Sequence, residues 1–284
     1  NNFYEQEKIQ KLFTYKYGKL NFNIINTKLN VNMIDNYVKT LKNDGTLVIN
    51  NYFTKNQCKN ILDYIKKFDY ISNNNIKYCE NKTNSGTYWC NENETINNNN
   101  LMELILDEGI LHILQEYLNS VPKLGTIMNW KTLPTKNIDE SIKDAQLFHQ
   151  DFTWNKFIKI FVYLNDVDLL NGPHRFVKNS FKNIPKKISD NYFPGMRLSD
   201  NDIKKIYGED SIYTITGEAG TIIIEDTRNM HSGTWCHEGV REIFQLNYTT
   251  SFWGAPNAKS CQKGIEIIKN KKTEFYNKYK EIYN

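Results

Sequence analysis

The spacing of apolar residues changes near residue 120 of this chain. Before that point, apolar positions recur every three or four residues, as on one face of an amphipathic helix. Thr54 stands where one such helix begins and has a side chain suited to capping it. Residues 47–49 indicate a buried strand, and the Asn-rich stretch 70–100 is typical of loops. We expect helices over residues 33–42, 55–68, 100–118 and 262–282.

From residue 124 onward the chain consists of short apolar and β-branched runs separated by turn residues. Residues 157–164 are almost all apolar, as in a strand that is covered on both faces. Many short strands with Gly and Pro between them indicate a sandwich or a barrel. The polar stretch 179–210 interrupts them and has the length of a functional lid or a disordered insertion. The expected strands are 124–133, 145–151, 157–165, 173–178, 211–216, 220–226 and 241–250.

Composition narrows the class of protein. With 39% hydrophobic and 13% aromatic residues, the chain can fill a sizeable core, and we expect one domain over residues 1–284. The net charge of +4 is spread along the chain, so no nucleic-acid partner is expected. No apolar run approaches the roughly 20 residues that span a bilayer. Five Cys without a CxxC motif are typical of reduced thiols, and no signal peptide is visible, so we expect a cytoplasmic protein.

One His-x-Asp motif is the first candidate for chemistry. On a strand, residues two apart project to the same face, so His149 and Asp151 would lie together. An imidazole and a carboxylate so placed suit two ligands of a facial triad, which leaves further positions on Fe(II) open for substrate and oxygen. The alternative is a surface His–Asp pair at the end of a strand.

A facial triad needs a second His from a distant strand, and His231 follows the strand-like run 220–226. Soon after it, Arg241 opens the next expected strand, in a chain with 32 Lys and only four Arg. 2-Oxoglutarate fits this arrangement, because its 2-oxo acid end chelates iron and its distal carboxylate needs a bidentate partner. Arg offers that fork and Lys does not. The alternative for Arg241 is a surface ion pair.

Several segments together resemble the phytanoyl-CoA dioxygenase family of Fe(II)/2-oxoglutarate oxygenases. They are DGTLVINNYF from residue 44, AQLFHQD from 145, FIKIFVYLNDVD from 157, NGPHRFV from 171, EDTRNMHSGT from 225 and GVREIFQLNY from 239. The resemblance implies a mainly β fold with flanking helices (α+β) around a double-stranded β-helix core of the jelly-roll or cupin type. We expect a helical part over about 33–120, the core over about 124–255 and a C-terminal helix over about 262–282.

The resemblance also implies an enzyme. It would use Fe(II), 2-oxoglutarate and O2 to hydroxylate a C–H bond of a small-molecule, lipid-type or saccharide-type substrate, releasing succinate and CO2. By position, His149, Asp151 and His231 match the catalytic iron ligands, and Arg241 matches the residue that binds the distal carboxylate. The presence of Asp151 argues against a halogenase. A non-catalytic binding or sensor protein of the same fold stays open, as do desaturation and epimerisation.

Further contacts are expected around this centre. Thr234 is expected to add a hydroxyl to the 2-oxoglutarate carboxylate, and either Asn129 or Thr132 a polar group from the strand before His149. We expect His174 to be structural. The sequence does not name the substrate or the oligomeric state. Candidate substrate contacts are Phe152, Trp154 and Asn155, the Tyr88–Trp89 region, and Arg197, which would bind an anionic substrate if it faces the pocket.

Overall fold

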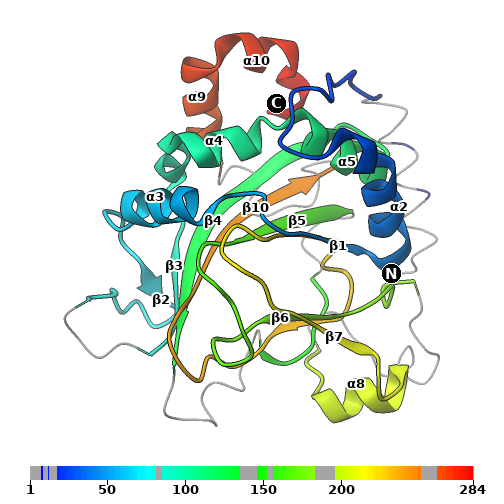
Figure 1. Cartoon of the computed structure of the whole chain (residues 1–284), viewed down its shortest axis with the longest axis vertical. Coiled ribbons are helices and arrows are strands. Elements are labelled where there is room, and N and C mark those ends of the chain that lie inside the picture. Colours follow the sequence, from blue (N-terminus) through cyan, green and yellow to red (C-terminus); the bar gives the residue numbers. More distant parts are fainter. Residues whose placement is uncertain are drawn as a thin grey trace.

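Two antiparallel sheets face each other, and most of the helices cover one of them (Figure 1). This computed structural model describes residues 8, 12, 18–80, 85–134, 146–151, 156–182, 196–250 and 261–283. The larger sheet has seven strands in the order β1-β8-β5-β10-β4-β3-β2. Its strands are β1 (Thr46–Ile49), β2 (Ile71–Ser72), β3 (Gly86–Cys90), β4 (Lys123–Leu133), β5 (Phe157–Tyr163), β8 (Ile222–Glu225) and β10 (Arg241–Thr249).

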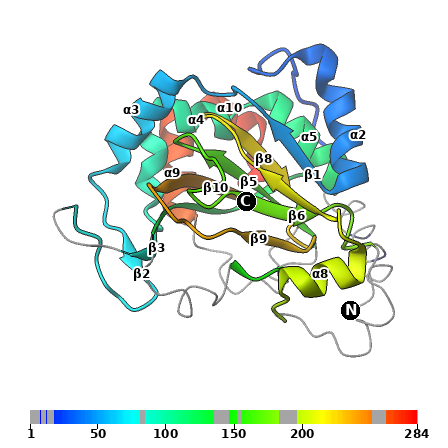
Figure 2. The ribbon, with the colours of Figure 1, turned by 60° about the horizontal axis from the view of Figure 1, so that its bottom comes forward.

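The smaller sheet has three strands in the order β7-β6-β9. Figure 2 shows β6 and β9 on the side of the large sheet that lies away from α4 and α5. Two facing antiparallel sheets with helices on one side confirm the predicted mainly β, double-stranded β-helix class. The strands of the smaller sheet are β6 (His174–Val177), β7 (Ile212–Ile215) and β9 (His231–Gly233).

Helices cover the outer face of the large sheet. Apolar side chains of α2, α3, α4 and α5 pack there against alternate residues of β5, β8 and β10, and Phe244 and Leu246 of β10 are fully buried among them. α8 packs instead beside the small sheet, through Ile203. The helices are α2 (Ile34–Asp44), α3 (Lys55–Ile65), α4 (Asn99–Ile105), α5 (Glu108–Leu118), α8 (Asp200–Tyr207), α9 (Gln262–Lys271) and α10 (Thr273–Lys278), with 3-10 turns at Val31–Met33, Asn93–Asn97 and Lys280–Ile282.

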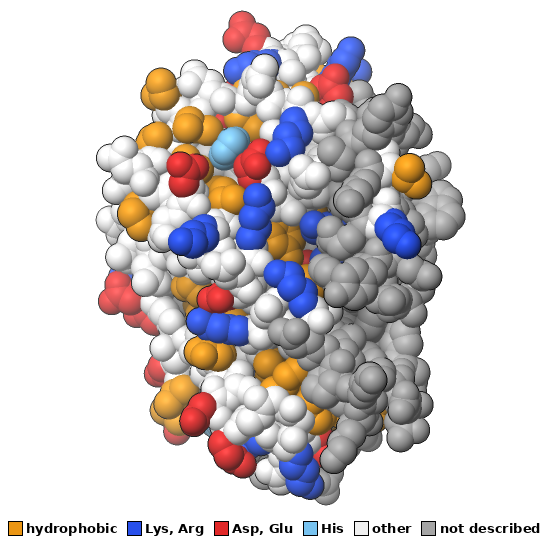
Figure 3. All heavy atoms as spheres, turned by 90° about the vertical axis from the view of Figure 1, so that its right-hand side faces the viewer, with side chains coloured by type: hydrophobic (Ala, Val, Ile, Leu, Met, Phe, Trp, Pro, Cys, Tyr) orange, Lys and Arg blue, Asp and Glu red, His pale blue; other side chains and the backbone are white. Residues whose placement is uncertain are grey.

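The central strand β5 explains the continuous apolar run in the sequence. Ile158, Ile160 and Val162 face the helices, whereas Phe161 and Tyr163 face the small sheet. Both faces of β5 are therefore buried, as the run predicted. Among the described helices, none is long and apolar enough to pass through a membrane. Basic side chains on the described part of one face are interleaved with acidic and uncharged ones (Figure 3).

Two predicted helices are divided in the structure. The helix expected over 100–118 breaks between α4 and α5, because the Asp107 side chain accepts a hydrogen bond from the Ile110 backbone and caps a new helix. The helix expected over 262–282 divides into α9, α10 and a 3-10 turn. Thr54 caps α3 as predicted, with a complete capping box.

Two other expectations were wrong, those for residues 70–100 and 145–151. The stretch expected to be loop over 70–100 contains β2 and β3, which add two strands to the edge of the large sheet. In the stretch 179–210, expected to be a lid or a disordered insertion, the described residues include α8, capped by Ser199. The strand expected at 145–151 is reduced, within the described residues, to single bridges at Phe148 and His149. Short polar segments such as these take their structure from the neighbour they pair with, which local sequence does not show.

The backbone of Gly220, just before β8, lies close to the backbone of Phe53 in the loop after β1, and substitution of Gly220 tests this close contact. Its φ is +94°, and a Cβ there would lie 1.9 Å from the Phe53 carbonyl oxygen. We expect Gly220→Ala to lower the free energy of unfolding by about 3–5 kcal/mol, because neither backbone can move without breaking the pairing. Gly239→Ala is the matched control: φ is +71° with open space around it, so about 1–2 kcal/mol is expected. Equal losses of the two variants in urea denaturation would contradict the clash.

Candidate metal centre

Two backbone hydrogen bonds bring the predicted triad together. The His149 N–H donates to the His231 carbonyl, the His231 N–H donates to the His149 carbonyl, and both bonds are 3.0 Å long. Asp151 lies between the two imidazoles, with its carboxylate oxygens 3.9 Å from His149 Nε2 and 3.5 Å from His231 Nε2. One ligand atom of each residue lies within 4.8 Å of the others. The three residues thus form a set of two nitrogens and one carboxylate.

Both imidazoles present Nε2 to this set. His149 Nδ1 lies 2.9 Å from the Leu147 carbonyl, and His231 Nδ1 lies 2.9 Å from the Asn229 carbonyl. Because a carbonyl only accepts, each Nδ1 carries the proton and Nε2 keeps its lone pair. Burial lowers the pKa of His149 to about 3, and it also lowers the pKa of His231. The pair is therefore neutral at pH 7, the form that binds a metal.

Lys159 of β5 holds the carboxylate of the triad. Its Nζ lies 2.6 Å from Asp151 Oδ2. Burial alone raises the pKa of Asp151, but the nearby Lys159 ammonium outweighs it, and the pKa is lowered. Sequence reasoning missed Lys159, although it is the one charged residue in the apolar run 157–164. A charge in a strand covered on both faces is the signal that could have found it.

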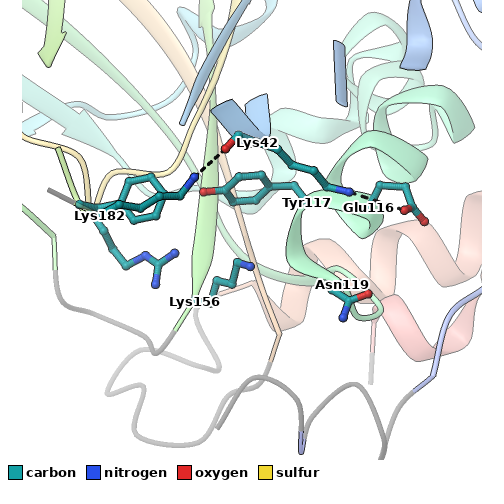
Figure 4. A pocket seen from close by; sticks show the side chains of 8 residues that line it. Lys42, Glu116, Tyr117, Asn119, Lys156 and Lys182 are labelled. Carbon is teal, nitrogen blue, oxygen red and sulfur yellow. Dashed lines mark hydrogen bonds and ion pairs between the residues drawn. The ribbon is translucent and has the colours of Figure 1, made fainter. Parts of the chain in front are cut away.

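The turn between β8 and β9 is buried and places His231. Asp226 pairs with Arg228 at 2.6 Å and accepts a hydrogen bond of 2.6 Å from the Tyr117 hydroxyl of α5. The Asp151 N–H donates to the Thr227 carbonyl in the same turn, so this turn supports two ligands. Figure 4 shows the hollow on the helix side of this turn, where the Lys156 ammonium lies 5.0 Å from the centre of the Tyr117 ring.

A cavity of about 340 Å³ lies between the two sheets, next to the triad. It is lined by residues of both sheets, and His149 and His231 are among them. Its volume is at the small end of the range for ligand pockets. Its other lining residues are Thr87, Trp89, Thr126, Met128, Trp130, Thr132, Gln146, Lys159, Phe161, Tyr163, His174, Gly233, Arg241, Ile243, Gln245 and Asn247.

Arg241 lies in the wall of this cavity as a buried cation. Its guanidinium donates to the Gly172 carbonyl and lies 3.5 Å from the Thr132 hydroxyl, but Nε has no partner. No carboxylate of the described part of the chain pairs with it. Gly233 leaves room for it, since a Cβ there would lie 3.1 Å from Nη2. A buried guanidinium without an anionic partner in this part of the chain has the chemistry of a carboxylate-binding site.

The other predicted contacts differ in where they lie. Thr132 lines the cavity opposite Arg241 on the neighbouring strand, whereas Asn129 is buried and is not among the lining residues. The Thr234 hydroxyl donates to the Pro173 carbonyl at 2.8 Å, and Thr234 is not among the lining residues. Arg197 is exposed, next to the bridge between Phe148 and Leu198, and does not line the cavity. Trp89 lines it and Tyr88 does not; Phe152, Trp154 and Asn155 lie outside the described residues.

His174, which was expected to be structural, also lines the cavity. Its Nε2 lies 2.5 Å from Glu225 Oε2, and its ring centre lies 5.8 Å from that of His231. Burial raises the pKa of Glu225 to about 8 and lowers that of His174 to about 3, so the pair is neutral at pH 7. It contributes polar atoms to the wall without adding charge.

Several solved structures are similar to this chain in fold. The epimerase SnoN from nogalamycin biosynthesis is 14% identical, with a TM-score of 0.55 over 78% of this chain and 84% of that one. HygX from Streptomyces hygroscopicus, with nickel and 2-oxoglutarate bound, is 14% identical, with a TM-score of 0.55 over 76% and 87%. The carbocyclase SnoK is 14% identical, with a TM-score of 0.53 over 81% and 87%. At these identities the likeness shows the fold.

The sequence itself also matches a family model. No sequence among the curated proteins matches the chain. The model of phytanoyl-CoA dioxygenase (PhyH) matches residues 41–234, which include His149, Asp151 and His231 and make up more than half of the chain. The chain therefore belongs to the phytanoyl-CoA dioxygenase (PhyH) family.

Proposed function

We propose that this protein is an Fe(II)- and 2-oxoglutarate-dependent dioxygenase that hydroxylates a C–H bond of a small-molecule substrate. The observation that carries the proposal is the pairing, in one cavity, of a His-Asp-His ligand set with a buried guanidinium that has no anionic partner among the described residues. The two features suit the two ends of 2-oxoglutarate. Family membership and the metal and 2-oxoglutarate bound by HygX support the same assignment.

The ligand set fits Fe(II) by its chemistry. Two neutral imidazoles and one carboxylate are the donors of a facial triad, which leaves positions open for a chelating cosubstrate and for oxygen. His149, Asp151 and His231 would hold the metal. When bound, Fe(II) with 2-oxoglutarate and O2 supplies the oxidising chemistry: 2-oxoglutarate leaves as succinate and CO2, and the substrate gains a hydroxyl.

The remaining residues of the cavity would bind the cosubstrate, orient the metal ligands and exclude water. Arg241 would take the distal carboxylate, with Thr132 beside it as the polar partner that we favour over Asn129. Lys159 would keep Asp151 charged and hold one of its oxygens. The apolar wall formed by Phe161 and Trp130, whose rings meet edge to face at 5.9 Å, would limit water around the reacting C–H bond.

Hydroxylation is the outcome we favour among those open to this chemistry. SnoN is an epimerase and SnoK a carbocyclase, so the fold accommodates more than one outcome. Product analysis by mass spectrometry under 18O2 separates them. A hydroxylase adds one labelled oxygen atom to its product, whereas epimerisation leaves the substrate mass unchanged.

Anaerobic absorption spectroscopy tests the ligand set. Adding Fe(II) and then 2-oxoglutarate to the protein is expected to give a weak visible charge-transfer band, because 2-oxoglutarate would chelate the Fe(II) that the triad holds. Asp151→Ala and His231→Ala should abolish or shift the band, whereas His237→Ala, which removes an exposed histidine, should keep it. The proposed function fails if the wild-type protein shows no band.

Substitution of Arg241 tests the cosubstrate end. Arg241→Met is expected to weaken 2-oxoglutarate binding about 100-fold, because charge-assisted bonds to a buried carboxylate are lost. Arg241→Lys should lie between this variant and wild type, since the charge stays but the fork is lost. Gly233→Ala should also weaken binding, by pressing on the guanidinium. Titration of the charge-transfer band measures each Kd, and unchanged values in all three variants would contradict the role.

The pH dependence of metal binding tests the histidine environment. Two histidines with the ordinary pKa near 6.5 would weaken metal binding roughly 15-fold between pH 8 and pH 6, through competition with protons. In this structure burial lowers both pKa values, that of His149 to about 3, so protons compete only at lower pH. The Kd for Co(II), followed by its visible absorption, should therefore change less than about threefold over this range. A steep loss of affinity below pH 7 would count against neutral, buried ligands.

A further inference from the structure

The cavity-facing side chains form rows across the large sheet, because paired antiparallel strands hold partners side by side. The row of Arg241 is polar and includes Thr132. The row of Asn247 lies six residues along β10, about 20 Å away at the rise of a strand. It consists of Thr126 of β4, Asn247 of β10 and Lys159 of β5, all of which line the cavity.

Apolar rows separate these two polar ends. Ile243 lies opposite Trp130, and Gln245 lies between Met128 and Phe161, so aromatic and apolar atoms form most of the middle wall. The metal ligands lie between the two ends: Lys159 of the Asn247 row contacts Asp151 at 2.6 Å, and Gly233, two residues after His231, lies against the Arg241 guanidinium. If Arg241 holds the distal carboxylate of 2-oxoglutarate, the Asn247 row is the polar end left for the substrate.

Two polar atoms in this row have no hydrogen-bond partner among the residues that the structure describes. Asn247 is only 2% exposed, and its Oδ1 is unpaired in the described part of the chain. The Thr126 hydroxyl, directly opposite, is buried and unpaired within the same residues. Leaving a buried polar group unpaired costs about 1–3 kcal/mol, so such groups call for an explanation. Two of them side by side in a cavity wall indicate a ligand that completes their bonds.

The chemistry of the Asn247 row limits the classes of ligand that can bind there. The Asn247 amide oxygen can only accept a hydrogen bond, whereas the Thr126 hydroxyl can donate or accept one. A ligand hydroxyl can therefore donate to Asn247 and accept from Thr126, but a carboxylate cannot donate to Asn247 Oδ1. The Lys159 charge is balanced by Asp151, and an ammonium ligand would be repelled by Lys159. Trp89 lies opposite Trp130 on the neighbouring strand, and their rings offer apolar surface to the C–H face of a ring.

We propose that Thr126 and Asn247 form a hydroxyl-recognition subsite, and that the substrate is a neutral, polyhydroxylated ring compound of the sugar or cyclitol class. This inference rests on the proposed function, because it needs 2-oxoglutarate at the Arg241 end of the same cavity. Asn247 and Thr126 bind a hydroxyl pair on one edge of the ring, and the rings of Trp89 and Trp130 pack against its face. The ring C–H nearest the triad is then the one presented for oxidation.

Calorimetric titration of the Ni(II)- and 2-oxoglutarate-loaded protein tests this subsite without turnover. The probes are D-glucose, myo-inositol, D-glucuronate and cyclohexanol. We expect a neutral polyol to bind more tightly than D-glucuronate or cyclohexanol. Asn247→Leu and Thr126→Val, both close in shape to the wild-type residues, should each weaken the best probe about 10-fold and leave the 2-oxoglutarate Kd within about twofold.

Tyr248→Phe provides the matched control. Its hydroxyl is also buried and unpaired within the described residues, but the side chain lies among the helix-facing core residues of the same strand. It should change neither Kd, which separates a contact in the subsite from the general effect of removing a buried polar atom from β10. Thermal unfolding of all three variants reports whether they are folded.

Each remaining outcome has a defined meaning. Unchanged probe affinity in folded Asn247→Leu and Thr126→Val overturns the subsite, as does tighter binding of D-glucuronate than of every neutral probe. Normal binding of Ni(II) and 2-oxoglutarate with no neutral probe bound also overturns the substrate class while leaving the proposed function intact. Failure to bind Ni(II) and 2-oxoglutarate at all overturns the proposed function, and the inference with it.

Discussion

The reciprocal backbone hydrogen bonds between His149 and His231 are the constraint on which the centre depends. They join two segments that are distant in the sequence, at a place where neither belongs to a long strand. Since each residue gives and accepts one bond, the two side chains are held on the same side of the bridge. Asp151 then needs only to follow two residues later to complete the ligand set, and the Thr227 carbonyl fixes its backbone. Small errors in this bridge would separate the donors.

Buried charge is balanced pair by pair around this bridge. Asp151 meets Lys159 and Asp226 meets Arg228, while the proton kept by Glu225 makes its contact with His174 neutral. An isolated buried charge is costly, so these pairings let a polar centre lie inside an apolar shell. Arg241 departs from the pattern within the described residues, which is why it indicates an anionic ligand rather than a structural ion pair.

Much of the fold could be predicted from local sequence, because its long elements have strong periodicity. The capped helix after Thr54, the buried strand β5 and the long strands β4 and β10 lie where the pattern placed them. The failures are short or polar elements. β2, β3 and α8 have only two, five and eight residues, and their structure depends on pairing or packing with partners elsewhere in the chain. Asp107 divides a continuous apolar stripe by capping, an effect that periodicity does not reveal.

The sequence by itself determined which residue types can do chemistry here: a His-x-Asp pair, a second His after a strand, and an Arg in a chain that otherwise uses Lys. These choices are visible because ligand chemistry and arginine geometry restrict residue type at single positions. Only the tertiary structure decided which side chains share a cavity. It placed Thr132 and Asn129 on opposite sides of β4, and it showed that Lys159, Gly233 and Asn247 also line the cavity. The reason is that the face of a strand and the register of its neighbours are set by pairing across the sheet, which no local stretch of sequence specifies.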